Sequence, residues 1–151
     1  MAFQGASVLS LDAKGRLSIP SRHRDALMAQ CAGNLVMTTH PHGCVAVFPL
    51  PVWEPMRDKI LAIPTLNNRS AADMRRLLVG NALDEEMDGN GRVLVAPALR
   101  EYAKLDKQVR LMGLGTHFEL WSEDVWQQQQ AEAAARFQSG ELPPGFEDIA
   151  L

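Results

Sequence analysis

An internal repeat limits how this chain can fold. Residues 12–16 and 88–92 both read Asp-x-x-Gly-Arg, and the second copy follows the first at an offset of 76 positions. A proline and an arginine follow each copy in the same order, and a Val-Trp pair closes each at an offset of 73. Two copies of one supersecondary unit predict a fold with two similar halves. The matched residues are Leu17 and Val93, Ile19 and Val95, Pro20 and Pro97, Arg24 and Arg100, and Val52-Trp53 and Val125-Trp126.

Each copy has the same expected order of elements. Short apolar runs on both sides of the glycine-containing turn predict a β-hairpin, formed by 8–11 with 16–19 and by 81–83 with 92–95. The proline that follows favours the first turn of a short helix, and Ser21 is placed to cap the first of these helices. Further strands are expected at 35–39, 44–48, 109–113 and 118–121. Closing helices are expected after Pro51 and from Ser122, where Glu123 and Asp124 suit a helix N-terminus.

These elements divide the chain into two units, a connector and a tail. We assign the first unit to 3–63 and the second to 81–138. Between them, 64–80 is expected to be an amphipathic connecting helix, because Ala71, Met74, Leu77 and Leu78 recur at helical spacing. The tail, 139–151, contains two adjacent prolines and two glycines and is expected to be extended or mobile.

Composition narrows the class of protein. The chain has 151 residues, 46% hydrophobic and 22% charged, which excludes a wholly disordered chain. It contains neither a secretory signal nor an apolar run of the roughly 18 residues that span a bilayer. Cys31 and Cys44 are too few for a disulfide scaffold. We therefore expect a soluble, reduced, cytoplasmic protein. Its net charge of −3 does not by itself suggest nucleic-acid binding. Such a function would require basic side chains clustered on part of the surface.

The repeated loop combines residues that shape a turn with one that can bind an anion. Asp12 can accept hydrogen bonds from backbone N–H groups in the turn, and Gly15 can adopt a positive φ. Arg16 then begins a strand on the face opposite Leu17. Either Arg16 pairs with Asp12 and only holds the turn, or the turn presents Arg16 to an anion. Asp88, Gly91 and Arg92 would do the same in the second copy.

The charge near the two loops differs. Around the first loop, four basic side chains face only Asp12, a local balance of +3 within a chain of −3. In the second loop Asn90 replaces the lysine, and the acidic residues Asp84, Glu85 and Glu86 precede it. We therefore expect the two copies to contribute unequally to anion binding. The four basic residues are Lys14, Arg16, Arg22 and Arg24.

With its doubled Asp-x-x-Gly-Arg motif, the chain resembles the MraZ family. The resemblance covers residues 3 to 138. The strings that carry it are Phe3-Gln4-Gly5, Asp12-Ala13-Lys14-Gly15-Arg16-Leu17-Ser18-Ile19-Pro20, Phe48-Pro49-Leu50-Pro51-Val52-Trp53 and Phe118-Glu119-Leu120-Trp121.

The resemblance implies an α+β fold of two tandem AbrB-like swapped-hairpin units, related by a pseudo-twofold axis within the chain. It further implies a bacterial transcriptional regulator on the nucleoid, usually a repressor of its own division and cell-wall gene cluster. Such a regulator forms ring-shaped homo-oligomers and binds short direct repeats in double-stranded promoter DNA. Arg16 is then the leading DNA contact, with Lys14, Arg22 and Arg24 on phosphates and Arg92 secondary. Asp12, Gly15, Asp88 and Gly91 organise the turns.

Three other interpretations compete with a DNA-binding regulator. His40, His42 and Cys44 alternate, as metal ligands on one strand face do. However, Pro41 and Gly43 favour a turn there, and the second copy does not repeat the pattern, so no metal is expected. No nucleophile, phosphate-loop or dinucleotide motif is complete, so we expect neither an enzyme nor a cofactor. An oligomeric scaffold without DNA binding remains the alternative function.

Overall fold

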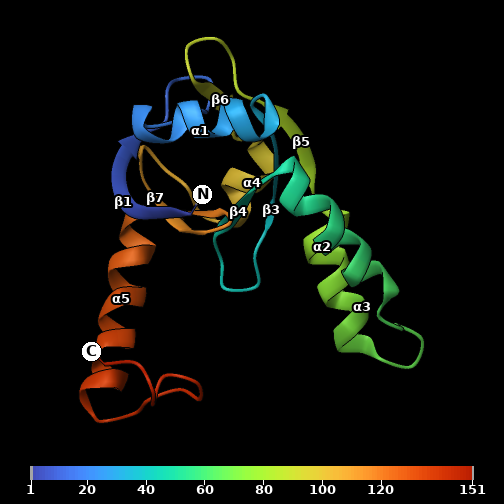
Figure 1. Ribbon diagram of the computed structural model, residues 1–151, viewed down its shortest axis with the longest axis vertical. Coiled ribbons are helices and arrows are strands. Elements are labelled where there is room, and N and C mark those ends of the chain that lie inside the picture. Colours follow the sequence, from blue (N-terminus) through green and yellow to red (C-terminus); the bar gives the residue numbers. More distant parts are fainter. Residues whose placement is uncertain (1, 151) are drawn as a thin grey trace.

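The computed structural model describes residues 2–150, and Figure 1 shows how its elements are arranged. The strands are β1 (Phe3–Ser10), β2 (Arg16–Ser18), β3 (Asn34–Thr39), β4 (Val45–Pro49), β5 (Leu83–Glu86), β6 (Arg92–Leu94), β7 (Gln108–Gly115) and β8 (Phe118–Ser122). The helices are α1 (Ser21–Cys31), α2 (Leu50–Ala62), α3 (Arg69–Arg75), the π-helical turn η1 (Arg76–Gly80), α4 (Pro97–Tyr102) and α5 (Glu123–Gln138).

The larger sheet interlocks the two halves of the chain. Its six strands are antiparallel, in the order β1-β7-β8-β4-β3-β5. Strand β1 of the first half pairs with β7 of the second, and β5 of the second half pairs with β3 of the first. At the centre Ala46 lies opposite Glu119, its own counterpart in the repeat. A pseudo-twofold axis therefore passes through the β4–β8 ladder, and the mixed α and β architecture of two tandem units is confirmed.

The smaller sheet repeats this symmetry and corrects the predicted hairpins. Strands β2 and β6 pair with each other, and Leu17 lies opposite its repeat counterpart Val93. The two strands that flank each loop do not pair with each other, so the local hairpin prediction is wrong. Strands β2 and β6 are each three residues long. Each has its hydrogen-bonded partner strand in the other half of the chain. The strand predicted at 81–83 instead occupies Leu83–Glu86, at the sheet edge where acidic side chains stay in solvent.

Side chains that alternate between the two faces of the central strands form two separate apolar clusters. The larger cluster contains Leu17 and Val93 of the small sheet, Leu27 of α1 and Leu99 of α4. On the opposite face of β3 and β4, Phe48 and neighbouring apolar residues pack against Trp53 of α2. Because successive side chains of a strand point to opposite faces, β3 and β4 are buried on both sides. The small sheet that supports both loops is therefore anchored directly in the larger core.

Prolines mark the starts of three helices. Pro97 is the first residue of α4, and α2 begins at Leu50, two residues earlier than the predicted start after Pro51. Pro20 occupies the N-cap of α1, so Ser21 is already helical and makes no capping hydrogen bond. The predicted Ser21 cap is therefore wrong. At α5, predicted to begin at Ser122, the helix begins at Glu123, and the Ser122 hydroxyl caps it by accepting a hydrogen bond from the Val125 N–H at 3.3 Å.

The connector ends in a π-helical turn before it reaches the sheet. Helix α3 runs into η1, and the extra backbone spacing of a π-turn leaves carbonyl groups free for other donors. The Thr38 hydroxyl donates to the Leu78 carbonyl at 2.8 Å, and the Thr39 hydroxyl donates to the Leu77 carbonyl at 2.8 Å. The connector is thereby tied to β3. None of the helices among residues 2–150 has the length and apolar character needed to cross a membrane.

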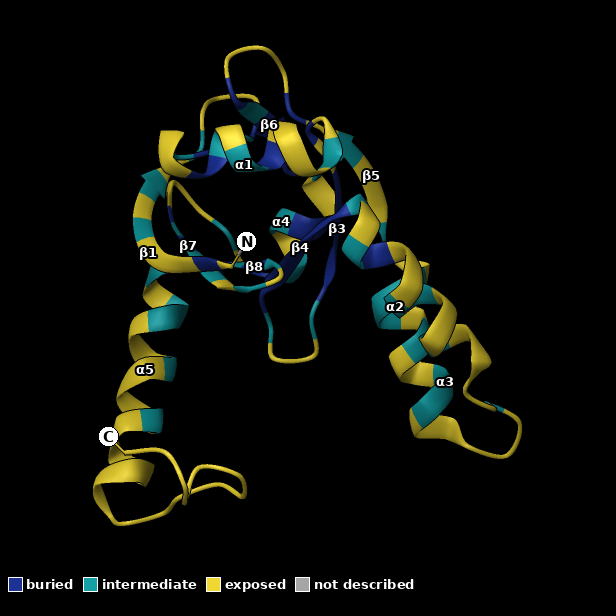
Figure 2. Cartoon of the chain, viewed as in Figure 1, coloured by how far each residue is buried: buried dark blue, intermediate teal, exposed yellow. Residues whose placement is uncertain are grey.

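The molecule presents its two loops at one end and its long helices at the other (Figure 1). The β1–β2 and β5–β6 loops protrude beside α1, whereas α5 and the α2–α3 arm point away from them. Figure 2 shows that the loops and both arms are mostly exposed. The tail at 139–150 is exposed and contains turns but neither helix nor strand; Leu151 lies outside the described residues.

Candidate nucleic-acid interface

The first loop is organised by one carboxylate. Asp12 Oδ1 accepts hydrogen bonds from the backbone N–H groups of Lys14 and Arg16, both at 2.9 Å. Asp12 Oδ2 accepts from Arg16 Nε at 2.7 Å. Gly15 has a φ of +82°, the left-handed conformation predicted for it. The predicted turn-organising roles of Asp12 and Gly15 match these contacts, and Arg16 is held by both its backbone and its side chain.

The second loop has the same geometry with a longer ion pair. Asp88 Oδ1 accepts from the N–H groups of Asn90 at 2.8 Å and Arg92 at 3.0 Å. Arg92 Nε donates to Asp88 Oδ2 at 3.3 Å, and Gly91 has a φ of +76°. The repeat therefore preserves the turn although Asn90 replaces the lysine.

The pKa of each loop carboxyl group is lowered by hydrogen bonds within its turn. The backbone N–H of Arg16, supported by the Arg16 side chain and the Lys14 N–H, lowers the pKa of Asp12 to about 2. The backbone N–H of Arg92 likewise lowers the pKa of Asp88. Hydrogen bonds to the ionised form are the main cause in each case, because the carboxylate accepts from two N–H groups at once. Both carboxylates are therefore ionised near neutral pH.

The two loop arginines lie on one face of the small sheet. Register in β2 and β6 places Arg16 opposite Leu94 and Ser18 opposite Arg92. Leu17 and its partner in β6 point inward and are fully buried, so the two arginines share the outward face. Within residues 2–150 the Nη atoms of Arg16 have no hydrogen-bond partner, since its recorded bonds use Nε and the backbone N–H. The guanidinium edge remains available to a ligand.

The other predicted basic contacts differ in their exposure and in their hydrogen-bond partners. Lys14 is exposed within the first loop. Arg22 of α1 is also exposed, and its Nη2 donates to the Ser7 hydroxyl of β1 at 2.8 Å. Arg24 is half-buried, and its Nε donates to the Ile19 carbonyl at 2.5 Å. Contact of these three residues with DNA stays a prediction, and Arg24 would have only its Nη atoms to offer.

Arg100 lies beside the first loop, a position that the sequence did not predict. It comes from α4 in the second half, and its guanidinium lies against Gly15 of the first loop. Its Nε donates to the Val95 carbonyl at 2.9 Å. The signal was present, because the repeat aligns Arg100 with Arg24, a residue already assigned to the site. The crossing of the two halves, which brings Arg100 to the first loop, has no local signature.

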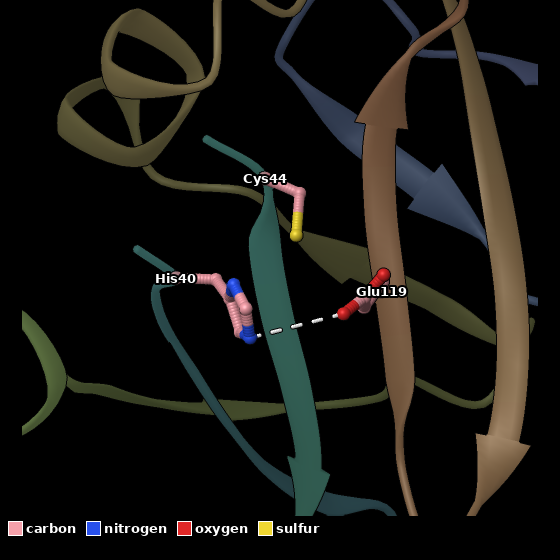
Figure 3. A group of neighbouring side chains, drawn as sticks. All are labelled: His40, Cys44 and Glu119. Carbon is pink, nitrogen blue, oxygen red and sulfur yellow. Dashed lines mark ion pairs between the residues drawn. The ribbon is translucent and has the colours of Figure 1, made fainter. Parts of the chain in front are cut away.

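A second cluster of polar side chains lies between the β3–β4 turn and strand β8, away from the loops (Figures 1 and 3). His40, Cys44 and Glu119 place their potential ligand atoms within 4.8 Å of one another. The His42 N–H donates to His40 Nδ1 at 3.0 Å, so a neutral His40 ring carries its proton on Nε2, toward Glu119. Burial also raises the pKa of the Cys44 thiol. The cluster offers three potential ligand atoms, whereas structural zinc generally takes four ligands.

Comparisons with known proteins agree with the repeat. A family model described as "MraZ protein, putative antitoxin-like" matches residues 2–76 and 78–141. A protein of Dechloromonas aromatica named "Transcriptional regulator MraZ" is 58% identical over 149 residues, covering 99% of both chains. Proteins of the same name from Aromatoleum aromaticum and Methylobacillus flagellatus are 57% and 52% identical over 149 residues, again covering 99% of both chains.

Proposed function

The chain belongs to the MraZ family, and from that premise we propose that it regulates transcription by binding promoter DNA through its first Asp-x-x-Gly-Arg loop. Its relatives are named transcriptional regulators and not enzymes, which agrees with the expected lack of catalytic activity. Following the resemblance, we propose that it represses its own division and cell-wall gene cluster by binding short direct repeats. Binding of this kind would place the protein on the nucleoid.

The geometry of Arg16 carries this proposal. Nε of Arg16 is held by Asp12 at 2.7 Å, so the side chain loses little conformational freedom when it binds. A guanidinium with free Nη atoms can donate to guanine O6 and N7 or to a phosphate. A two-stranded ribbon such as β2–β6 also fits the major groove of B-DNA. We therefore assign Arg16 to direct DNA contact at the outward face of this ribbon.

The unequal charge of the loops supports a leading role for the first. Lys14 adds a positive charge to the first loop. Arg22 of α1 adds another, and its side chain donates a hydrogen bond to Ser7 of β1. We propose that these two, with Arg24 through its Nη atoms, contact phosphates and position the protein. The second loop follows the acidic strand β5, which repels a polyanion. Arg92 is therefore a secondary contact.

We also propose that the protein acts as a ring-shaped homo-oligomer. One basic loop on a chain of net charge −3 offers few contacts to DNA, whereas linked copies can raise avidity by ~10²–10⁴. The α2–α3 arm and α5 project on opposite sides of the molecule (Figure 1) and expose apolar side chains. Contact between unlike surfaces of successive copies closes a ring when the rotation permits. The exposed residues are Leu61, Ile63, Leu66 and Met74 on the first arm, and Phe137, Leu142, Phe146 and Ile149 on α5 and the tail.

Binding to the DNA immediately upstream of the protein's own gene tests the proposed function. Fluorescence anisotropy over a salt series should show affinity about 10³-fold or more above that for a scrambled duplex. Affinity should fall linearly with the logarithm of salt concentration, because bound phosphates release counterions. No binding to either duplex would favour the alternative, an oligomeric scaffold. Equal affinity for both would contradict sequence-specific regulation.

A further inference from the structure

We propose that each loop is positioned by an arginine from the opposite half of the chain, so that Arg100 sets the direction of Arg16 in the DNA-contacting loop. Arg24 correspondingly positions the second loop. Both arginines are positioning residues that act through Gly15 and Gly91. The consequence for DNA affinity rests on the proposed function, whereas the contacts themselves do not.

Arg100 meets the first loop at its glycine. A Cβ added to Gly15 would lie 2.7 Å from Arg100 Cζ and 2.7 Å from its Nε, a distance that real side chains do not tolerate. Gly15 is accordingly buried although its neighbour Lys14 is exposed. The carbonyl of Gly15 accepts from the Val95 N–H at 3.0 Å, and the carbonyl of Val95 accepts from Arg100 Nε at 2.9 Å. Arg100 thus holds the loop both directly and through Val95.

Arg24 makes the same contacts with the second loop. A Cβ added to Gly91 would lie 2.8 Å from Arg24 Cζ and 2.6 Å from its Cδ. The Gly91 carbonyl accepts from the Ile19 N–H at 2.8 Å, and the Ile19 carbonyl accepts from Arg24 Nε at 2.5 Å. Gly91 is buried between exposed and half-buried neighbours, as Gly15 is. The same arrangement of three residues is formed twice with exchanged halves, as the pseudo-twofold symmetry of the fold requires.

This arrangement explains why each loop needs glycine before its arginine. Gly15 combines a φ of +82° with a surface that lets a guanidinium lie against it. Since Arg16 follows directly in the chain, any shift of Gly15 redirects the Arg16 side chain. Sequence proximity would assign Arg24 to the first loop, but its contacts place it on the second.

Lysine can separate this positioning role from a charge contact with DNA. A guanidinium is planar, so it can lie flat on a glycine while its Nε–H donates to a carbonyl. The lysine ammonium keeps the positive charge but has no such plane. Arg100→Lys therefore retains any simple attraction to phosphate and removes the packing on Gly15. Arg24→Lys is its matched control in the other half.

The first test measures backbone hydrogen exchange by mass spectrometry on the full-length protein without DNA. Arg100→Lys should speed exchange in 12–16 and leave 88–92 unchanged, whereas Arg24→Lys should do the reverse. Faster exchange confined to the loop of the variant's own half would overturn the proposal, as would wild-type exchange in both variants. This readout stands even if the wild-type protein binds no DNA, in which case the proposed function alone fails.

The second test measures affinity for the upstream duplex over a salt series. Arg100→Lys should bind at least about tenfold more weakly at every salt concentration, about 1.4 kcal/mol, with an unchanged salt slope. Arg57→Lys, on α2 and outside both loops, should stay within about twofold of the wild type, well under the 1.4 kcal/mol of a tenfold change. Wild-type affinity of Arg100→Lys would overturn the proposal. A reduced salt slope in Arg100→Ala with normal affinity in Arg100→Lys would instead identify a phosphate contact and also overturn it.

Discussion

Arg16 and Arg92 lie on the same outward face of the β2–β6 sheet, diagonally across the buried pair of Leu17 and Val93. The pseudo-twofold axis that relates the two halves passes through that pair, so the arginines occupy equivalent positions. Their surroundings are not equivalent, because Lys14 precedes one arginine and the acidic strand β5 precedes the other. A symmetric scaffold thus presents an asymmetric charge to its ligand.

Replacing Lys14 with alanine should weaken binding to all DNA sequences to a similar degree. A lysine that neutralises one phosphate contributes a salt slope of about 0.9, so log K against log salt should flatten by that amount. Asn90 occupies the equivalent position in the second loop, and Asn90→Lys should leave the slope unchanged if that loop stays off the DNA. A Lys14→Ala slope equal to that of the wild type would rule out the phosphate contact.

Replacing Leu17 with alanine should destabilise the fold rather than the interface. Leu17 is fully buried at the pseudo-twofold axis, and Leu→Ala at such sites costs about 2–5 kcal/mol. Ser18→Ala, on the exposed face of the same strand, should stay within about 0.5 kcal/mol of the wild type. Chemical denaturation at one fixed protein concentration measures both, and equal stability of the two variants would contradict the packing described here.

The parts of the fold that depend on neighbouring residues could be predicted from the sequence. Asp12 makes all its loop contacts within four residues, and the positive φ of Gly15 follows from its residue type. Strand partners could not be predicted in the same way. Ser10 pairs with Gln108, and no local pattern distinguishes that partner from a hairpin neighbour. The acidic strand β5 was predicted too early in the chain, at 81–83, because an edge position leaves its carboxylates in water and gives them no apolar pattern.

The site was predictable to the same extent. The sequence predicts the position of Arg16 in the turn because residue type and turn geometry coincide in one short motif. Arg100 beside Gly15 and Glu119 beside His40 arise only where the two halves cross. The repeat supplied the correspondence of Arg24 with Arg100 but gave no information on which loop each would touch.

The Asp12 carboxyl should titrate near pH 2, well below its ordinary value of 3.8. Because the folded pKa is the lower one, the contribution of Asp12 to stability is present above pH 3.8 and is lost as the pH falls toward 2. Asp88 should follow the same direction. NMR titration of side-chain carboxyl carbons measures both pKa values. The signal of Asp12 is assigned by its absence in Asp12→Asn. Titration of Asp12 near its ordinary value would show that the turn is not held by the carboxylate.

Charged substitutions on the projecting arms should dissociate the oligomer. Ile63 is 52% exposed after α2, and Phe137 is 51% exposed near the end of α5. Ile63→Glu or Phe137→Glu places a charge in the apolar contact proposed between successive copies. Light scattering should report a mass close to that of single chains or small assemblies, whereas Val8→Glu on β1 should leave the large species intact. An unchanged mass for both arm variants would place the contact elsewhere.

Affinity of Arg16→Ala and Arg92→Ala for the upstream duplex, measured side by side with oligomer mass checked by light scattering, is the most direct test of DNA binding by the first loop. We expect Arg16→Ala to abolish specific binding with the oligomer intact, since losing a contact worth about 1–3 kcal/mol is repeated at every engaged subunit. Arg92→Ala should cause a smaller loss. Wild-type affinity of Arg16→Ala, or a larger loss in Arg92→Ala with intact oligomers, would contradict the assignment of DNA contact to Arg16.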